Sequence, residues 1–246
     1  MDLFYDRLPD HREKSLYRQI DTAVGRHLPS FSAGAGVPVR RLRTICRYVA
    51  LDHPEFFWFA GDFSLSGNSG GPQTLCFEYP APYRDLDRVD RAIGEAVREI
   101  GADRFPDPET RARAVYDWFL DSIGYDLSAA DQPGKDSQTV YSVFVRKKSL
   151  CLGIARAIHL ILRLYNVDSL VVLGRLCGED RCGHAWNLVK TGSGYRHMDV
   201  TAAYPCFREM WTRCHGSPDP CFLVTDDFLR TTHRITDPAV YPPAGR

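Results

Sequence analysis

Three residues whose side chains can cooperate in nucleophilic catalysis lie close together in the sequence: Cys151, His184 and Asp199. A cysteine thiolate attacks carbonyl carbons, and a neighbouring imidazole exchanges the proton with the thiol and the leaving group. A carboxylate beside the imidazole fixes its tautomer and stabilises the imidazolium. The three residues therefore predict a Cys-His-Asp triad, and such a triad requires neither a metal nor an organic cofactor.

The element that positions the cysteine is predicted to be a helix. Ser149 comes two residues before Cys151, and a largely apolar run follows as far as Tyr165. Ser149 is expected to cap this helix, leaving the thiol in its first turn, where the helix dipole lowers the pKa of a cysteine. Because the polar residues of the run are spaced by three and four, they form one narrow, partly exposed stripe on an otherwise buried helix: Arg156, His159 and Arg163.

The histidine and the aspartate are predicted to lie on two strands of a hairpin. Residues 183–190 and 195–201 are rich in strand formers and flank a Gly-rich turn. A two-residue loop would pair Trp186 with Asp199, and a four-residue loop would pair His184 with Asp199. Because side chains alternate along a strand, either register puts His184 and Asp199 on the same face.

Three sequence blocks resemble the transglutaminase-like superfamily, whose core shares the papain-like cysteine protease architecture. They are Ser149-Leu150-Cys151-Leu152-Gly153, Gly183-His184-Ala185-Trp186-Asn187 and Met198-Asp199-Val200-Thr201. The resemblance implies an α+β fold in which a catalytic helix packs on an antiparallel sheet. It also implies that Cys151 is the nucleophile, His184 the general acid/base and Asp199 the orienting carboxylate.

The same resemblance leaves several functional alternatives open. Trp186 is interpreted either as hairpin core, which is slightly favoured, or as a substrate-binding wall of an acyl tunnel. In a peptidase or amidase, water would attack a thioester on Cys151, whereas in a transglutaminase a primary amine would attack it. Hydrolysis is the preferred interpretation. A catalytically silent peptide-binding module of the same fold is the alternative from another functional class.

The composition favours a soluble protein, and the resemblance implies a protein or peptide substrate. Lys plus Arg and Asp plus Glu both number 31 in 246 residues, so no net charge attracts nucleic acid or an anionic membrane. The first residues are charged, and no apolar run reaches membrane-spanning length. We therefore expect a cytoplasmic protein, without nucleic-acid or membrane partners and with an undetermined oligomeric state.

Two regions are expected, with a boundary near the prolines at 106 and 108. Residues 1–104 are predicted to be mostly helical, with helices near 12–27, 40–51 and 86–100 and a short hairpin with strands near 56–60 and 74–79. Residues 105–246 are predicted to hold a helix near 109–123, the catalytic core and an irregular C-terminal covering segment.

Eight cysteines are present, and several cluster in the last third of the chain: Cys177, Cys182, Cys206, Cys214 and Cys221. The pairwise Cys-x-x-Cys spacing of structural zinc sites is missing, so free thiols are favoured over a zinc site or disulfides. A metal-binding structural protein built on this cluster is the third hypothesis.

Overall fold

The computed structural model describes residues 2–34, 36–67, 73–79, 85–130, 132–134, 136–177, 183–207 and 221–245. The chain divides into two compact units, Met1–Arg84 and Asp85–Arg246. The boundary expected at residue 105 falls inside the second unit instead. The reason is that the helix at residues 86–100 packs against helices of the second unit, so the two prolines separate neighbouring helices rather than compact units.

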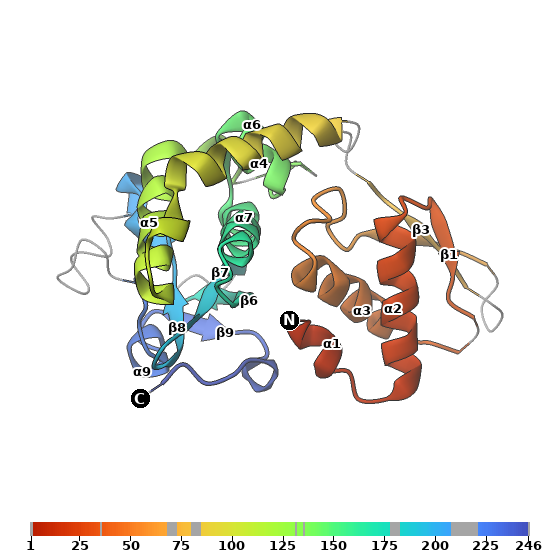
Figure 1. Ribbon diagram of the computed structural model, residues 1–246. Coiled ribbons are helices and arrows are strands. Elements are labelled where there is room, and N and C mark those ends of the chain that lie inside the picture. Colours follow the sequence, from red (N-terminus) through yellow and green to blue (C-terminus); the bar gives the residue numbers. More distant parts are fainter. Residues whose placement is uncertain are drawn as a thin grey trace. The chain divides into compact units, whose positions relative to one another are not determined.

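The first unit combines helices with a small antiparallel sheet (Figure 1). Its strand order is β1-β3-β2. The elements are α1 (Leu3–Asp6), α2 (His11–Gly25), β1 (Ser30–Ser32), α3 (Val39–Asp52), β2 (Phe63–Ser66) and β3 (Thr74–Phe77). The strand predicted near residues 56–60 is wrong, because those residues form turns closed by hydrogen bonds such as Phe59 N to Phe56 O at 2.9 Å.

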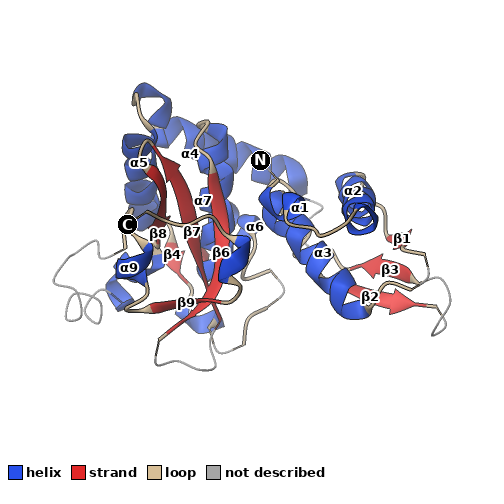
Figure 2. Cartoon of the chain, turned by 90° about the horizontal axis from the view of Figure 1, so that it is seen from below, coloured by secondary structure: helices blue, strands red, loops and turns tan. Residues whose placement is uncertain are grey.

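The second unit consists of helices packed around a four-stranded antiparallel sheet in the order β8-β7-β6-β9 (Figure 2). A separate parallel pair joins β4 to β5. The helices are α4 (Leu86–Ile100), α5 (Pro108–Ser122), α6 (Val140–Arg146), α7 (Cys151–Leu164) and α9 (Asp226–Leu229). The strands are β4 (Gly124–Tyr125), β5 (Lys148–Ser149), β6 (Ser169–Leu176), β7 (Gly183–Thr191), β8 (Gly194–Met198) and β9 (His233–Ile235). Short 3-10 helices span Ala102–Arg104, Leu127–Ala129, Thr201–Ala203 and Pro238–Val240.

The predicted α+β fold is confirmed, with α7 packed on β6 and β7 of the antiparallel sheet. Local signals explain several element ends. Asp107 accepts a hydrogen bond from Thr110 N at 2.8 Å and caps α5, whose first residue is Pro108. Gly101 ends α4 with a φ of 54°, a conformation that glycine adopts without strain.

Helix α7 is buried more completely than its polar stripe indicated. His159 was expected to be partly exposed, but it is buried, and its Nδ1 forms a 2.9 Å hydrogen bond with the hydroxyl of Ser169 on β6. Arg156 is buried as well. At His159, therefore, β6 covers a face of α7 that the spacing assigned to solvent. Of the helices formed by the described residues, none is both long and apolar enough to cross a lipid bilayer.

Candidate active site

Cys151 is the first residue of α7, and its thiol lies at the helix N-terminus as predicted. The capping prediction is wrong, because Leu150 occupies the N-cap position and makes no side-chain cap. Ser149 belongs to β5, and its hydroxyl donates to the carbonyl of Ser137 at 2.9 Å and shares a 2.7 Å hydrogen bond with Ser142. Ser149 thus ties the segment before the helix to a neighbouring loop.

That loop crosses the first turn of α7 so closely that only glycine fits at position 153. A Cβ on Gly153 would lie 2.2 Å from the Ser149 hydroxyl and 2.9 Å from the carbonyl carbon of Gln138. Leu150 N also donates to Ser137 O at 3.1 Å. The close packing fixes the position of the helix start and, with it, the thiol.

His184 and Asp199 come together through the register of the β7–β8 hairpin. The strands pair Thr191 with Gly194, which confirms the two-residue loop and aligns Trp186 with Asp199. Both side chains are buried, and His184 Nε2 donates to Asp199 Oδ2 at 2.8 Å. The remaining ring nitrogen of His184 is Nδ1, and the imidazole also hydrogen-bonds the Cys151 thiol. The structure therefore brings the three predicted residues together in one chain of hydrogen bonds.

The electrostatics of these groups favour a thiolate beside an imidazolium. Burial raises the pKa of the Cys151 thiol, but the hydrogen bond and positive charge of His184 and the Ala185 N–H together lower it below its usual value. Burial lowers the pKa of His184, whereas the charge and hydrogen bond of Asp199 raise it to about 10. Burial raises the pKa of Asp199, but His184 and a second histidine hold it well below its usual range.

The second histidine is His233 on β9, which sequence reasoning missed. Its Nε2 donates to Asp199 Oδ2 at 3.2 Å, so two imidazoles share one carboxylate oxygen. The other oxygen of Asp199 accepts from Thr201 N at 2.9 Å, and His233 Nδ1 hydrogen-bonds the Thr232 hydroxyl at 2.8 Å. No local motif marks His233; it reaches the site because β9 pairs with β6.

Ligand atoms of His184, Asp199 and His233 lie within 4.8 Å of one another, a spacing that a metal ion could also use. Here, however, the carboxylate already satisfies both imidazoles through hydrogen bonds. The arrangement matches the orienting carboxylate of a proton-transfer site.

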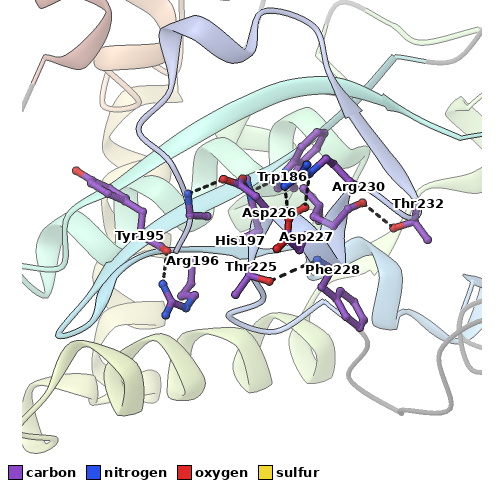
Figure 3. A network of polar contacts seen from close by, with 12 residues as sticks. Trp186, Tyr195, Arg196, His197, Thr225, Asp226, Asp227, Phe228, Arg230 and Thr232 are labelled. Carbon is purple, nitrogen blue, oxygen red and sulfur yellow. Dashed lines mark hydrogen bonds and ion pairs between the residues drawn. The ribbon is translucent and has the colours of Figure 1, made fainter. Parts of the chain in front are cut away.

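Trp186 packs against His184 instead of facing the cavity. It is buried, and its ring lies 5.8 Å from that of His184 in a stacked arrangement. Its indole N–H donates to His197 Nδ1 at 3.1 Å, and His197 Nε2 donates to Asp226 Oδ1 at 2.8 Å (Figure 3). Asp226 Oδ2 in turn accepts from Ala244 N at 2.9 Å. These contacts match the hairpin-core interpretation of Trp186, which is not among the described residues that line the cavity.

A second hydrogen bond attaches α7 to β7 from the other face of the sheet. Asn187 alternates with His184 and Trp186 along the strand, and its side-chain amide donates to the carbonyl of Ala155 on α7 at 2.9 Å. The strand that carries the histidine is thereby fixed to the helix that carries the cysteine.

The triad opens onto a cavity of about 980 Å³ in the second unit. Apart from Cys151, His184 and Asp199, the described lining residues are uncharged, and most are apolar. They include Tyr125, Leu127, Ala130, Pro133, Gln138, Leu150, Leu152, Leu173, Leu176, Ala202 and Phe207. A cavity of this size and character fits the uncharged parts of an organic substrate.

Three of the five clustered cysteines lie in the described part of the chain, and none of these three forms a disulfide. Cys177 and Cys206 are exposed and Cys221 is buried, and all three are free thiols. Cys182 and Cys214 lie outside the described residues. The described part of the chain therefore contains no disulfide.

Comparison with known proteins finds a family model that matches part of the second unit. Residues 98–200 match the sequence model of the transglutaminase-like superfamily, a segment that contains all three triad residues. The fold resembles that of a TGase with 16% identity and a TM-score of 0.41, covering 57% of this chain and 44% of that one. It also resembles a candidate cysteine protease from Cytophaga hutchinsonii with 13% identity and a TM-score of 0.39, covering 59% of this chain and 63% of that one. A candidate protease from Parabacteroides distasonis shows 12% identity and a TM-score of 0.32, with 54% of this chain and 29% of that one covered.

The aligned parts span less than two thirds of each of these structures. No curated protein matches the chain. The family match covers α7 and both strands of the hairpin, which are the elements that carry the candidate site. Residues 98–200, which carry all three predicted site residues, are therefore similar to the transglutaminase-like superfamily.

Proposed function

We propose that the protein is a cysteine-dependent acyl-transfer enzyme that acts on peptide or glutamine amides through a thioester on Cys151. The observation that carries this proposal is the hydrogen-bonded series from Cys151 through His184 to Asp199 at the wall of an open cavity. A buried cysteine with only a structural role would need neither an imidazole that lowers its pKa nor a cavity beside it.

The reaction follows from the protonation states of the resting site. The thiolate of Cys151 donates an electron pair to the amide carbonyl carbon, forming a C–S bond while the carbonyl π electrons move to oxygen. When the oxyanion collapses, the C–N bond breaks and the amine leaves with a proton from the His184 imidazolium. His184, now neutral, then removes a proton from the second nucleophile, which attacks the thioester and releases the thiolate.

Hydrolysis is proposed as the main fate of the thioester. Water is present at roughly 55 M, so an amine competes only where the site binds it and shields the thioester from water. Among the described lining residues, the sole carboxylate is Asp199, which is buried between His184 and His233. The described wall therefore offers no free acidic group to recruit a lysine side chain.

The proposal is tested by incubating the protein with glutamine-containing peptides and a labelled primary amine. Ammonia release, peptide cleavage and amine incorporation are measured in parallel, with Cys151→Ser as the inactive variant and Cys206→Ser as the matched control. We expect ammonia release or cleavage that is lost in Cys151→Ser and kept in Cys206→Ser. Incorporation outrunning hydrolysis would make the protein a transglutaminase, and turnover by Cys151→Ser equal to that of the native protein would contradict the thioester.

A further inference from the structure

Tyr125 contacts the reacting sulfur but has no part in the mechanism derived so far. It lines the same cavity as Cys151, and its hydroxyl hydrogen-bonds the Cys151 sulfur. The other groups that contact this sulfur, the His184 ring and the Ala185 N–H, both come from β7. Tyr125 therefore brings a donor to the sulfur from a different strand than the one that carries the catalytic base.

The position of Tyr125 is fixed by the segment that leads into the catalytic helix. β4 pairs in parallel with β5 and sets Tyr125 opposite Ser149, two residues before Cys151. Hydrogen bonds on both sides hold the pair, from Gly124 N to Lys147 O at 2.8 Å and from Asp126 N to Ser149 O at 2.9 Å. Any shift of the helix start would move Tyr125 with it.

Aromatic packing restrains the ring itself. The Phe207 ring lies 4.9 Å from the Tyr125 ring in an edge-to-face arrangement, and the Tyr204 ring lies 6.1 Å away. The phenol is thus held at the cavity wall with its hydroxyl directed to the sulfur, and a donor with so little freedom loses little entropy when it binds a developing charge.

We propose that the Tyr125 hydroxyl is the second donor of the oxyanion hole, acting with the backbone N–H of Cys151. This inference rests on the proposed acyl-transfer function. When the thiolate attacks, the carbonyl oxygen of the substrate becomes an oxyanion. This oxygen is bonded to the carbon that joins the sulfur, so it lies within reach of donors that already contact the sulfur. The Cys151 N–H lies at the helix start, where backbone N–H groups have no partner within the helix.

The hydroxyl acts as a hydrogen-bond donor and transfers no proton. Formation of the C–S bond moves the carbonyl π pair to oxygen, and the Tyr125 O–H switches its hydrogen bond from sulfur to that oxygen. Collapse returns the pair to the carbonyl and expels the amine with a proton from His184. Burial, together with the charges of Cys151 and Asp199, raises the pKa of Tyr125 above its usual value, so the phenol keeps its proton.

Two reactions of Cys151 separate this role from stabilisation of the thiolate. Iodoacetamide alkylates the sulfur by displacement at carbon and forms no oxyanion. p-Nitrophenyl acetate acylates it through a tetrahedral oxyanion and releases nitrophenolate, whose absorbance is followed. Both rates are measured for the native protein, Tyr125→Phe and the control Tyr204→Phe, which removes a neighbouring hydroxyl that donates to Phe119 O at 3.3 Å.

We expect Tyr125→Phe to lower the acylation rate by about 10²-fold, as loss of one oxyanion donor does, while the alkylation rate changes by less than about threefold. Tyr204→Phe should leave both rates unchanged. Acylation of Tyr125→Phe at the native rate would overturn the donor role alone. A parallel fall in both rates would also overturn it, because it would show that Tyr125 sets the thiolate population. Native protein that is alkylated at Cys151 but never acylated would refute both the donor and the proposed function.

Discussion

Replacing Asp199 by Asn tests how strongly the carboxylate controls the catalytic pair. Asp199 Oδ2 accepts from two imidazoles and Oδ1 accepts from Thr201 N. An amide placed there has one oxygen and one NH₂ group. If the NH₂ group faces the two histidines, their N–H donors lose their acceptor; if it faces Thr201, the Thr201 N–H loses its acceptor. In either case a buried donor is left facing another donor.

The size of the effect follows from the pKa of His184. Its rise from 6.5 to about 10 corresponds to roughly 5 kcal/mol in favour of the imidazolium. The charge of Asp199 is the largest contribution that raises it. If Asn removes about 3 kcal/mol of this preference, the pKa of His184 falls by about two units, so the rate of Cys151 acylation falls by up to about 10²-fold near pH 10 and by much less at neutral pH. In the native protein the acylation rate should decrease at alkaline pH, near pH 10, as His184 loses its proton. In Asp199→Asn this alkaline limb of the pH–rate profile should move to lower pH.

The assay is nitrophenolate release from p-nitrophenyl acetate as a function of pH. The matched control is Asp226→Asn, because Asp226 makes a 2.8 Å hydrogen bond to His197 in the same unit but does not contact His184 or Cys151. Asp226→Asn should change the rate by less than about fivefold and leave the alkaline limb in place. An Asp199→Asn variant with the native rate and the native alkaline limb would refute the reasoning and leave Asp199 as a structural hydrogen-bond acceptor.

Three further predictions concern the packing at Gly153, the hydrogen bond of His233 and the titration of Asp52 in the first unit. Gly153→Ala should lower the free energy of unfolding by about 1–3 kcal/mol in chemical denaturation, because its Cβ meets backbone and hydroxyl atoms below 3 Å. Gly94→Ala on α4 meets only the far end of the Arg98 side chain at 3.6 Å and should instead be neutral or stabilising by up to about 1 kcal/mol, so equal losses would contradict the packing argument. His233→Ala should slow acylation about tenfold and His233→Gln, which keeps an N–H donor, should restore part of the rate; the same loss in both would show that the hydrogen bond to Asp199 is not the cause. Burial raises the pKa of Asp52 from 3.8 to about 6, so the folded state binds more protons between these values and its stability falls as pH rises from about 4 to 6, by about 3 kcal/mol from this group. Asp52→Asn should flatten that slope in unfolding measurements on the whole chain, and an unchanged slope would contradict the assignment.

Local sequence signals predicted the elements that carry the triad. The apolar run after Cys151 predicted α7, and strand alternation placed His184 and Asp199 on one face in either of the two registers considered; the structure has the register with the two-residue loop. These features depend on side-chain periodicity and turn chemistry within short segments, which is why sequence reasoning could reach them.

The errors arose where contacts distant in sequence decide the outcome. His233 enters the site only because β9 pairs with β6, and His159 is buried because it meets Ser169 across a helix–sheet contact. Ser149 does not cap α7, because it belongs to β5, which pairs with β4, and because the Ser149 hydroxyl donates to the carbonyl of Ser137 instead. Periodicity identifies the faces of an element but not which neighbour covers each face.

The proposed function depends most directly on ionisation of Cys151 by His184. The decisive measurement is peptide mapping after brief iodoacetamide treatment at pH 6, on the native protein and on His184→Ala. In the native protein Cys151 should be labelled well before Cys46 and Cys76, because its thiol pKa is lowered whereas burial raises that of Cys46 to about 12. In His184→Ala this advantage should disappear. Equal labelling of all cysteines in the native protein, or rapid labelling of Cys151 without His184, would contradict an activated cysteine–histidine pair.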